Sequence, residues 1–200
     1  MRTLFSTCAL VLLTLSLNTF AQEPYRFSGT RYSITHQDKG SFQEISLRGV
    51  ILSGFVEDLD GLKAVQKKLI PDLPIRLVLH SGGGFQMRFN QLARSLRKAC
   101  PKERCEITTV VESMCASACI PLFMVGDVRE ASRYASFGFH QAAVVPGAVM
   151  IPRMAQRDLR RAGVDETWLQ ENDSMFQSLD ITWRRPRQLH GSNIVTREIE

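Results

Sequence analysis

The chain has 200 residues with 25 lysines and arginines against 20 aspartates and glutamates, and 44% of its residues are hydrophobic, which suits one domain with a substantial core. Its net charge of +5 is modest. The basic side chains are scattered or lie late in the chain with few aromatic residues among them, which is typical of solvated helix faces and argues against a nucleic-acid interface.

Residues 1–21 have the pattern of a secretory signal peptide. Arg2 supplies a positive charge, the run from Phe5 to Leu17 is apolar and uncharged, and small residues precede a cleavage position after Ala21. The apolar run is short for the roughly 20 residues of a membrane-spanning helix, although an uncleaved anchor is the alternative. We therefore expect a soluble mature protein that starts near Gln22 and is periplasmic or secreted.

The rest of the sequence alternates strand and helix patterns, which favours a parallel sheet with crossover helices. Residues 22–44 are polar and mixed, and we expect an extended N-terminal arm there. Residues 45–200 are expected to form one α/β domain with a helical C-terminal portion. In chain order the expected elements are a strand at 45–51, a helix at 56–70, a strand at 75–79, a helix around 89–96, strands at 107–111 and 134–139 that flank a helix at 116–125, helical residues from 152, and a strand at 194–196.

Four cysteines remain after the expected cleavage: Cys100, Cys105, Cys115 and Cys119. An even number in an exported chain favours disulfides. Cys100 and Cys105 are joined by a short polar loop between apolar segments, so they form the most natural pair. A zinc site is the alternative, but the spacing of four, nine and three intervening residues lacks the paired Cys-x-x-Cys pattern of such sites.

A glycine-rich turn is the first segment that suggests chemistry. Ser81-Gly82-Gly83-Gly84 follows one predicted strand and precedes a predicted helix. Glycines allow a positive φ, and backbone N–H groups at a helix start attract negative charge. The turn lacks the lysine of a P-loop and the spacing of a dinucleotide-binding fold. A phosphate site, an oxyanion site and a plain tight turn all remain open for it.

Two further segments carry a serine and a histidine. In Cys115-Ala116-Ser117-Ala118-Cys119, Ser117 lies where a predicted strand meets a predicted helix. A serine at such a turn exposes its hydroxyl beside a free backbone N–H, although it can equally cap the helix. In Phe137-Gly138-Phe139-His140-Gln141, a predicted strand ends on His140. A histidine alone in that position is more often structural than catalytic.

Together and in this order, the three segments resemble the proteolytic subunit of the Clp protease. The likeness is closer to exported, Clp-protease-like proteins of bacteria, which carry the Cys-Ala-Ser-Ala-Cys and Phe-Gly-Phe-His forms. It covers roughly residues 45–196 and implies a ClpP/crotonase-like fold, an α/β fold with a parallel sheet and crossover helices. Proteins of this superfamily usually associate, so the resemblance also implies a homo-oligomer.

The resemblance assigns roles to a serine, a histidine and an aspartate. It implies that Ser117 is the nucleophile and His140 its general base. A third residue should hold the imidazole in the right tautomer. The family places an aspartate shortly before a proline-led helix near the C-terminus, and Asp180, six residues before Pro186, fits that position. Asp173 is the runner-up.

The resemblance also implies an oxyanion hole, built from the N–H groups of Gly84 or Gly83 and of Ala118. Preorganised donors of this kind stabilise the charge that develops in acyl transfer. The chain departs from the Clp subunit in three ways, the first being that the spacing from Ser117 to His140 is about two residues shorter. Gly82 stands where the Clp subunit usually has proline, and two cysteines flank the serine, where a bridge could rigidify or obstruct the turn.

The leading functional hypothesis is an exported serine hydrolase, a peptidase that acts on peptide or small acyl substrates without metal or cofactor. An ATP-driven unfoldase is not expected as a partner, because an exported protein has no ATP to use. A non-catalytic scaffold or binding protein of the periplasm is the first alternative. A crotonase-type acyl-thioester enzyme is the second, but a serine and a histidine together favour hydrolysis, and coenzyme A is scarce outside the cytoplasm.

Overall fold

A computed structural model of the chain describes residues 24–28, 31–51, 57–141 and 154–200. The expected signal peptide, residues 1–21, lies outside these residues, so its cleavage stays a prediction. Among the described residues, no helix is both long and apolar enough to cross a membrane.

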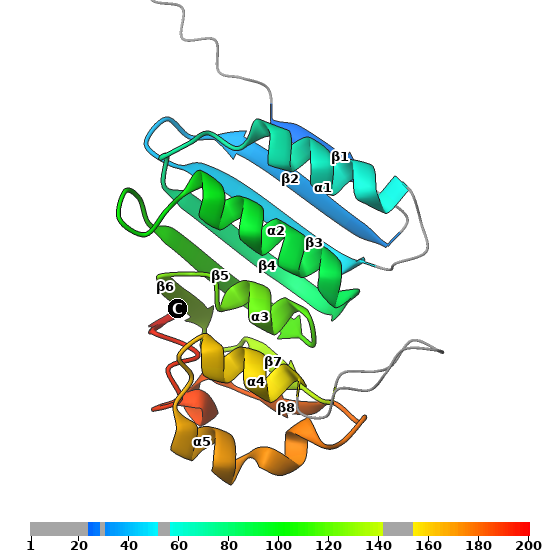
Figure 1. Cartoon of the computed structure of the whole chain (residues 1–200), viewed down its shortest axis with the longest axis vertical. Helices are drawn as coiled ribbons and strands as arrows, with labels where there is room; N and C mark the ends of the chain where they lie inside the picture. The colour runs from blue at the N-terminus through cyan, green and yellow to red at the C-terminus, as the bar shows by residue number, and fades with distance from the viewer. Residues whose placement is uncertain (1–23, 29–30, 52–56, 142–153) are drawn as a thin grey trace, which may run out of the picture.

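The described residues form a mixed α/β fold around one largely parallel sheet (Figure 1), which confirms the predicted α/β class. The strands run in the order β1-β2-β3-β4-β5-β6-β9, and β7 joins β5 to β8 beside this path. Pairing is parallel from β3 onward, except between β7 and β8. The strands are β1 (Tyr25–Ser28), β2 (Tyr32–Asp38), β3 (Gln43–Ile51), β4 (Ile75–Gly84), β5 (Ile107–Ala116), β6 (Val128–Ser132), β7 (Ser136–Phe139), β8 (Thr182–Arg184) and β9 (Arg197–Ile199).

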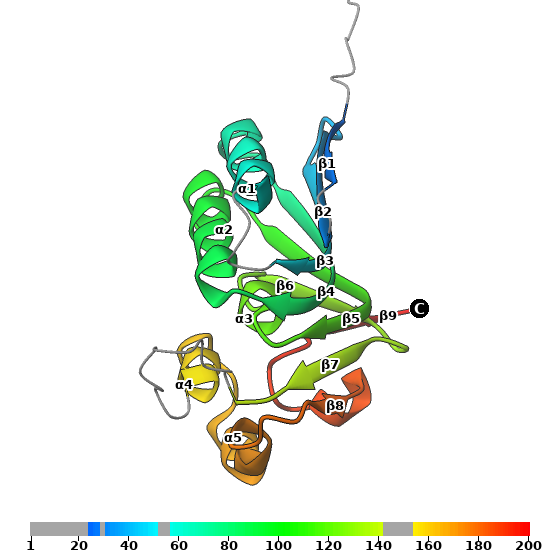
Figure 2. The same ribbon diagram turned by 90° about the vertical axis from the view of Figure 1, so that its right-hand side faces the viewer.

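Helices α1, α2 and α3 cover one face of the sheet, and α4 and α5 lie at the end of the molecule that holds β7 and β8 (Figure 2). In α2 the apolar residues Phe89, Leu92 and Leu96 recur at helical spacing and are fully buried against the sheet. The helices are α1 (Glu57–Lys68), α2 (Gln86–Ala99), α3 (Cys119–Phe123), α4 (Met154–Arg161) and α5 (Glu166–Glu171), with short 3-10 turns at Asp173–Phe176 and Pro186–Leu189.

The segment expected as an extended arm takes part in the sheet. Its residues form β1 and β2, which pair antiparallel with each other, and β2 pairs antiparallel with β3. Tyr32 and Ile34 alternate with polar residues along β2, and both are buried. His36, next in the alternation, is also buried and its Nε2 lies 3.1 Å from Gln43 Oε1. This polar sequence is therefore extended and contributes to the core of the sheet.

Strand β5 is longer than predicted and organises the centre of the fold. The apolar pattern ends at Val111, but the strand continues through the exposed Glu112 and Ser113 to Ala116. Its first half pairs with β6 and its last three residues pair with β7. The residues of β5 that pair with β6 and those that pair with β7 thus lie on either side of the polar Glu112 and Ser113. The predicted helix at 116–125 is accordingly shorter and starts only at Cys119.

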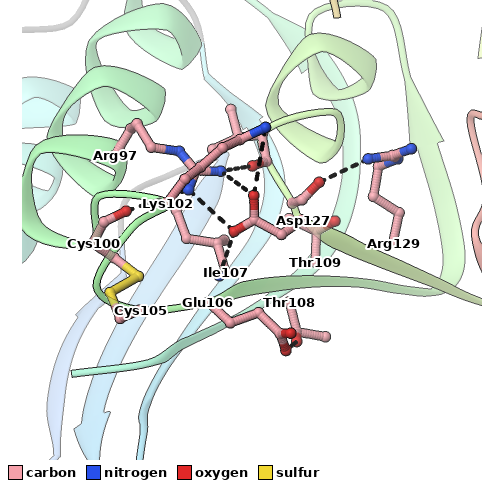
Figure 3. Close-up of polar contacts among 12 residues, drawn as sticks. Arg97, Cys100, Lys102, Cys105, Glu106, Ile107, Thr108, Thr109, Asp127 and Arg129 are labelled. Atoms are coloured by element: carbon pink, nitrogen blue, oxygen red, sulfur yellow. Dashed lines mark hydrogen bonds and ion pairs between the residues drawn. A yellow bond between two sulfur atoms is a disulfide. The ribbon is translucent and has the colours of Figure 1, made fainter. Parts of the chain in front are cut away.

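The start of β5 is fixed by a charged network around Asp127, shown in Figure 3. The Asp127 carboxylate accepts hydrogen bonds from Arg97 at 3.0 and 3.1 Å and from the Ile107 N–H at 2.9 Å. The Lys102 Nζ lies 3.8 Å from Asp127 Oδ1. Burial alone would raise the pKa of Asp127, but the hydrogen bonds from Arg97 and Ile107 and the charges of Arg97 and Lys102 outweigh it and lower the pKa.

We expect Asp127→Asn to lower the free energy of unfolding by about 1–3 kcal/mol at neutral pH, because it leaves Arg97 without its carboxylate partner. The folded-state pKa of Asp127 is depressed, so its contribution is present above the unfolded value of 3.8 and is lost as the pH falls through the folded value. Urea unfolding of the wild type and variant should therefore differ at neutral pH and converge in acid.

Asp72→Asn is the matched control, because Asp72 forms an ion pair with Arg104 at 3.0 Å that is largely exposed. Exposed pairs contribute about 0–1 kcal/mol. Equal losses of stability in Asp72→Asn and Asp127→Asn would contradict the importance given to the Asp127 network.

Candidate active site

Ser117 occupies a sharp turn between β5 and α3. Its φ of +54° is in the left-handed region, which serine rarely adopts and which costs about 1–3 kcal/mol. Two backbone hydrogen bonds bracket the turn: the Ser117 N–H donates to the Gly138 carbonyl at 2.9 Å, and the Ser117 carbonyl accepts from the Ile120 N–H at 3.0 Å. A strained serine between a strand and a helix is the local geometry of a nucleophile elbow.

Ser81–Gly84, predicted as a turn, instead forms the last residues of β4. This glycine segment packs directly against the serine turn, and Gly83 makes the approach possible. A Cβ on Gly83 would lie 2.5 Å from the Ala116 carbonyl oxygen, 2.8 Å from Ser117 Cβ and 2.9 Å from the Ala118 nitrogen. Gly83 also has a φ of +91°. Only glycine combines this backbone conformation with such a close approach. The structure therefore brings together two of the three predicted segments.

The predicted oxyanion donors differ in their surroundings. The Gly83 N–H already donates to Ser81 Oγ at 3.0 Å. Gly84 has a φ of +130° and packs against the Ile51 backbone, where a side chain would overlap the carbonyl. Ala118 lies at the start of α3, where backbone N–H groups have no acceptor within the helix. The oxyanion roles of Gly83, Gly84 and Ala118 stay predictions, and Ala118 has the most suitable position.

One small pocket is lined by both Ser117 and His140, which lie 23 residues apart in the sequence. It has a volume of about 30 Å³, and its walls are mostly apolar. The remaining lining residues come from five segments: Gln86, Ile120, Pro121, Gly138, Phe139, Ala155, Leu159 and Phe176. The structure thus places the predicted nucleophile and the predicted base in one cavity.

His140 follows the last residue of β7, and its Nδ1 is buried. Among the described residues this atom has no hydrogen-bond partner. Asp180 is exposed, and its backbone N–H donates to Ser178 Oγ at 3.0 Å. The segment that contains Asp180 nevertheless runs beside the histidine, because the Gln141 N–H donates to the Ser178 carbonyl at 2.7 Å. The role of Asp180 as third member of a triad stays a prediction.

Asp173, the runner-up for that role, has other partners. Its carboxylate accepts hydrogen bonds from Gln156 Nε2 at 3.1 Å and from Gln177. Gln156 is buried and also donates to the Leu169 carbonyl. These contacts tie α4 to the 3-10 turn that begins at Asp173.

The four cysteines that follow the expected signal peptide all form disulfides, which leaves none of these four as a thiolate for the alternative zinc site. Cys100 pairs with Cys105, as the sequence predicts, with Cα atoms 5.3 Å apart. Cys115 pairs with Cys119 across the turn that carries Ser117, with Cα atoms 5.4 Å apart. Both distances lie within the usual range for a disulfide. Among the described residues, no cluster of histidine, cysteine and acidic side chains is arranged to hold a metal ion.

The outer wall of the pocket comes from segments that sequence reasoning did not connect with the site. Ala155 and Leu159 project from α4, four residues apart, and Phe176 comes from the following 3-10 turn. The Phe139 ring contacts Phe176 and Trp168, with centroids 5.9 and 5.8 Å apart. The helical spacing of Ala155 and Leu159 predicts an apolar helix face. The spacing does not show which part of the protein that face packs against, so it did not point to the pocket.

Gln86 links the two walls of the pocket. It is the first residue of α2, two residues after Gly84, and its amide lies 3.5 Å from an Asp158 carboxylate oxygen on α4. Burial raises the pKa of Asp158, and the charges of Arg161 and Arg157 oppose this shift. The contact joins the start of α2 to α4.

Neither a family model nor a curated protein matches this sequence. Solved structures do match its fold. One is described only as an enzyme and has a TM-score of 0.55, and another is a peptidase from Plasmodium falciparum with a TM-score of 0.54. Each is 12% identical and aligns with 78% of this chain and 95% of its own. At this identity the likeness shows a shared fold, and that fold is one that a peptidase also uses.

Proposed function

We propose that this protein is an exported serine hydrolase with a ClpP/crotonase-like fold, and that it acts as a peptidase. One observation supports this most directly: Ser117, strained at a φ of +54°, shares a small pocket with His140. A serine hydroxyl is a weak nucleophile and needs an adjacent base. The fold shared with a peptidase agrees with this chemistry, and the two disulfides are compatible with an oxidising compartment outside the cytoplasm.

In the proposed reaction, Ser117 Oγ attacks the acyl carbon of the substrate while His140 accepts the hydroxyl proton. The imidazolium then gives this proton to the leaving amine or alkoxide, which departs and leaves an acyl-serine. Water, deprotonated by His140, releases the acid and restores the serine. Because His140 Nδ1 is buried, we assign the proton transfers to Nε2. The Ala118 N–H and one of the glycine N–H groups would stabilise the oxyanion.

The pocket suggests what such an enzyme accepts. Its volume of about 30 Å³ and its aliphatic and aromatic lining suit a small apolar group beside the scissile bond. No ATP-driven unfoldase enters this proposal, so substrates would be short or already unfolded peptides and small acyl compounds. Assembly into a homo-oligomer, which the resemblance implies, is part of the same proposal.

A non-catalytic binding protein is the second candidate, and two observations favour it. His140 Nδ1 has no hydrogen-bond partner among the described residues, and Asp180 is exposed. A base without an orienting partner is less effective, since the third group fixes the tautomer. A scaffold would retain the pocket and bind peptides without cleaving them.

Hydrolysis by the wild type and by Ser117→Ala, at matched folded concentration, separates the two candidates. The substrates are nitrophenyl esters of short acids and a panel of short fluorogenic peptides. We expect turnover by the wild type that falls to background in Ser117→Ala. Equal rates above background would remove Ser117 as nucleophile. Binding of the peptides without turnover by either protein would favour the scaffold.

A further inference from the structure

The disulfide between Cys115 and Cys119 encloses the predicted nucleophile. Cys115 is near the end of β5, Cys119 is the first residue of α3, and Ser117 is midway between them. We propose that this disulfide is a positioning element of the active site, which holds Ser117 in its left-handed conformation with the hydroxyl in the pocket. The inference rests on the proposed function and adds a residue pair that acts on Ser117 without touching substrate.

The turn has a conformation that its own residue disfavours. Serine at a φ of +54° is strained, and glycine would be the ordinary choice there. If released, Ser117 would relax toward a negative φ, and its hydroxyl would leave the position that the turn gives it. Its two backbone hydrogen bonds, to Gly138 and from Ile120, hold the flanks of the turn but are replaceable by other partners. A covalent link between the end of the strand and the start of the helix is not replaceable.

Both sulfur atoms lie away from the pocket, so the disulfide can position Ser117 but cannot contact a substrate. Cys115 and Cys119 are both completely buried and belong to the hydrophobic core, whereas Ser117 is half-buried. Neither cysteine lines the pocket that Ser117 and His140 share. The disulfide therefore acts from the core side, through the backbone of the turn.

The second disulfide of the chain is a matched control. Cys100 and Cys105 are five positions apart, against four for Cys115 and Cys119, and the Cα separations are 5.3 and 5.4 Å. The control pair precedes β5 and the proposed pair is at its far end, about 30 Å away along ten strand residues. Loops of similar length should constrain the unfolded chain to a similar extent. If removing one disulfide lowers the activity and removing the other does not, the cause is the position of the disulfide in the fold and not a general loss of stability.

The experiment compares C115V/C119A with C100V/C105A in the full mature protein. Valine with alanine fills the space of the two sulfur atoms with apolar carbon, which limits the loss of packing. Circular dichroism and thermal unfolding establish the folded fraction. The readouts are kcat and KM for the best ester or peptide substrate, and the rate at which a fluorophosphonate probe labels the protein. A crystal structure of C115V/C119A gives the φ of residue 117.

We expect kcat and the labelling rate of C115V/C119A to fall by about tenfold to a hundredfold, since a displacement of about 1 Å in a catalytic group can have such an effect. KM should change little, and C100V/C105A should keep the wild-type kcat. In the crystal structure Ser117 should have left the left-handed region. A wild-type kcat in C115V/C119A, or equal losses in both variants, would overturn the proposal while leaving the serine hydrolase function intact.

Failure of the proposed function has a different signature. If the wild type neither hydrolyses the panel nor reacts with the probe, Ser117 is not an activated nucleophile. The crystal structure then still decides the role of the disulfide. A left-handed Ser117 with its hydroxyl in the pocket of C115V/C119A would overturn the proposal, and a relaxed Ser117 would support it. If C115V/C119A does not fold, the single variant C119A is used with the same readouts.

Discussion

Replacing Ser117 or His140 by alanine is expected to remove nearly all hydrolytic activity, at least about a thousandfold in kcat, and the double variant should be hardly worse than either single one. The two residues line one pocket and would act as a unit, in which the base is useless without the hydroxyl and the hydroxyl is unreactive without the base. Steady-state kinetics of the four proteins on one ester substrate measures this non-additivity.

A second serine–histidine pair in the same chain is the control. His80 Nδ1 is hydrogen-bonded to Ser113 Oγ, where β4 and β5 run side by side, and neither residue lines the pocket. Ser113→Ala should keep wild-type kcat and KM. Losses in Ser117→Ala and His140→Ala that add fully in the double variant would contradict a shared step. If kcat fell as much in Ser113→Ala as in Ser117→Ala, the activity would not depend on a serine in the pocket.

Gly83→Ala is expected to have the second largest effect, on both stability and activity. The new Cβ would lie 2.5 Å from the Ala116 carbonyl oxygen and 2.8 Å from Ser117 Cβ, so the glycine segment or the serine turn must move. The positive φ of Gly83 adds about 1–2 kcal/mol of strain for alanine. Because the overlap adds to this strain, we expect the free energy of unfolding to fall by more than the roughly 1–2 kcal/mol due to φ alone. We expect kcat to fall by about a hundredfold, because the nucleophile is displaced.

Gly163→Ala separates the effect of the positive φ from the effect of steric overlap with the serine turn. Gly163 follows α4 with a φ of +86°, but a Cβ there would meet nothing within 4 Å. It should lose about 1–2 kcal/mol of stability with unchanged kcat. Chemical denaturation and ester kinetics on both variants make the comparison. If Gly83→Ala behaves like Gly163→Ala, the contact between the glycine segment and the serine turn does not position Ser117.

The fold was predictable where apolar periodicity and glycine turns mark the elements. Strand β3 and helix α2 form where the sequence places them. Strand β4 begins where predicted but continues through Ser81–Gly84, because pairing with β3 and β5 keeps this glycine-rich segment in the sheet. Strands β6 and β8 were not predicted, because they are short and depend on partners that lie far along the chain. The predicted strand at 194–196 is displaced to Arg197–Ile199, since pairing with β6 sets its register and not its apolar residues. Long-range pairing of this kind leaves little trace in a local pattern.

The site was predictable to the level of its segments. The resemblance that the order of the glycine, serine and histidine segments carries implied that they meet. In the structure Gly83 packs on Ser117, and His140 lines the same pocket as Ser117. The strain at Ser117 was not visible, because a φ angle depends on neighbours in space. For the third member of a triad, the resemblance favoured Asp180 over Asp173, but several aspartates lie late in the chain, and position along the sequence does not show which of them faces the imidazole. The apolar face of α4 was visible in the spacing of Ala155 and Leu159, but the sequence did not show that this face lines the pocket.

The central claim is that Ser117 is a nucleophile activated by His140, and covalent labelling tests it most directly. The mature protein is incubated with a fluorophosphonate, digested and examined by mass spectrometry, beside His140→Ala as the control. The proposal predicts one phosphonylated residue, Ser117, in the wild type and almost none in His140→Ala. An unlabelled wild type, a modification at another serine, or equal labelling of His140→Ala would contradict it.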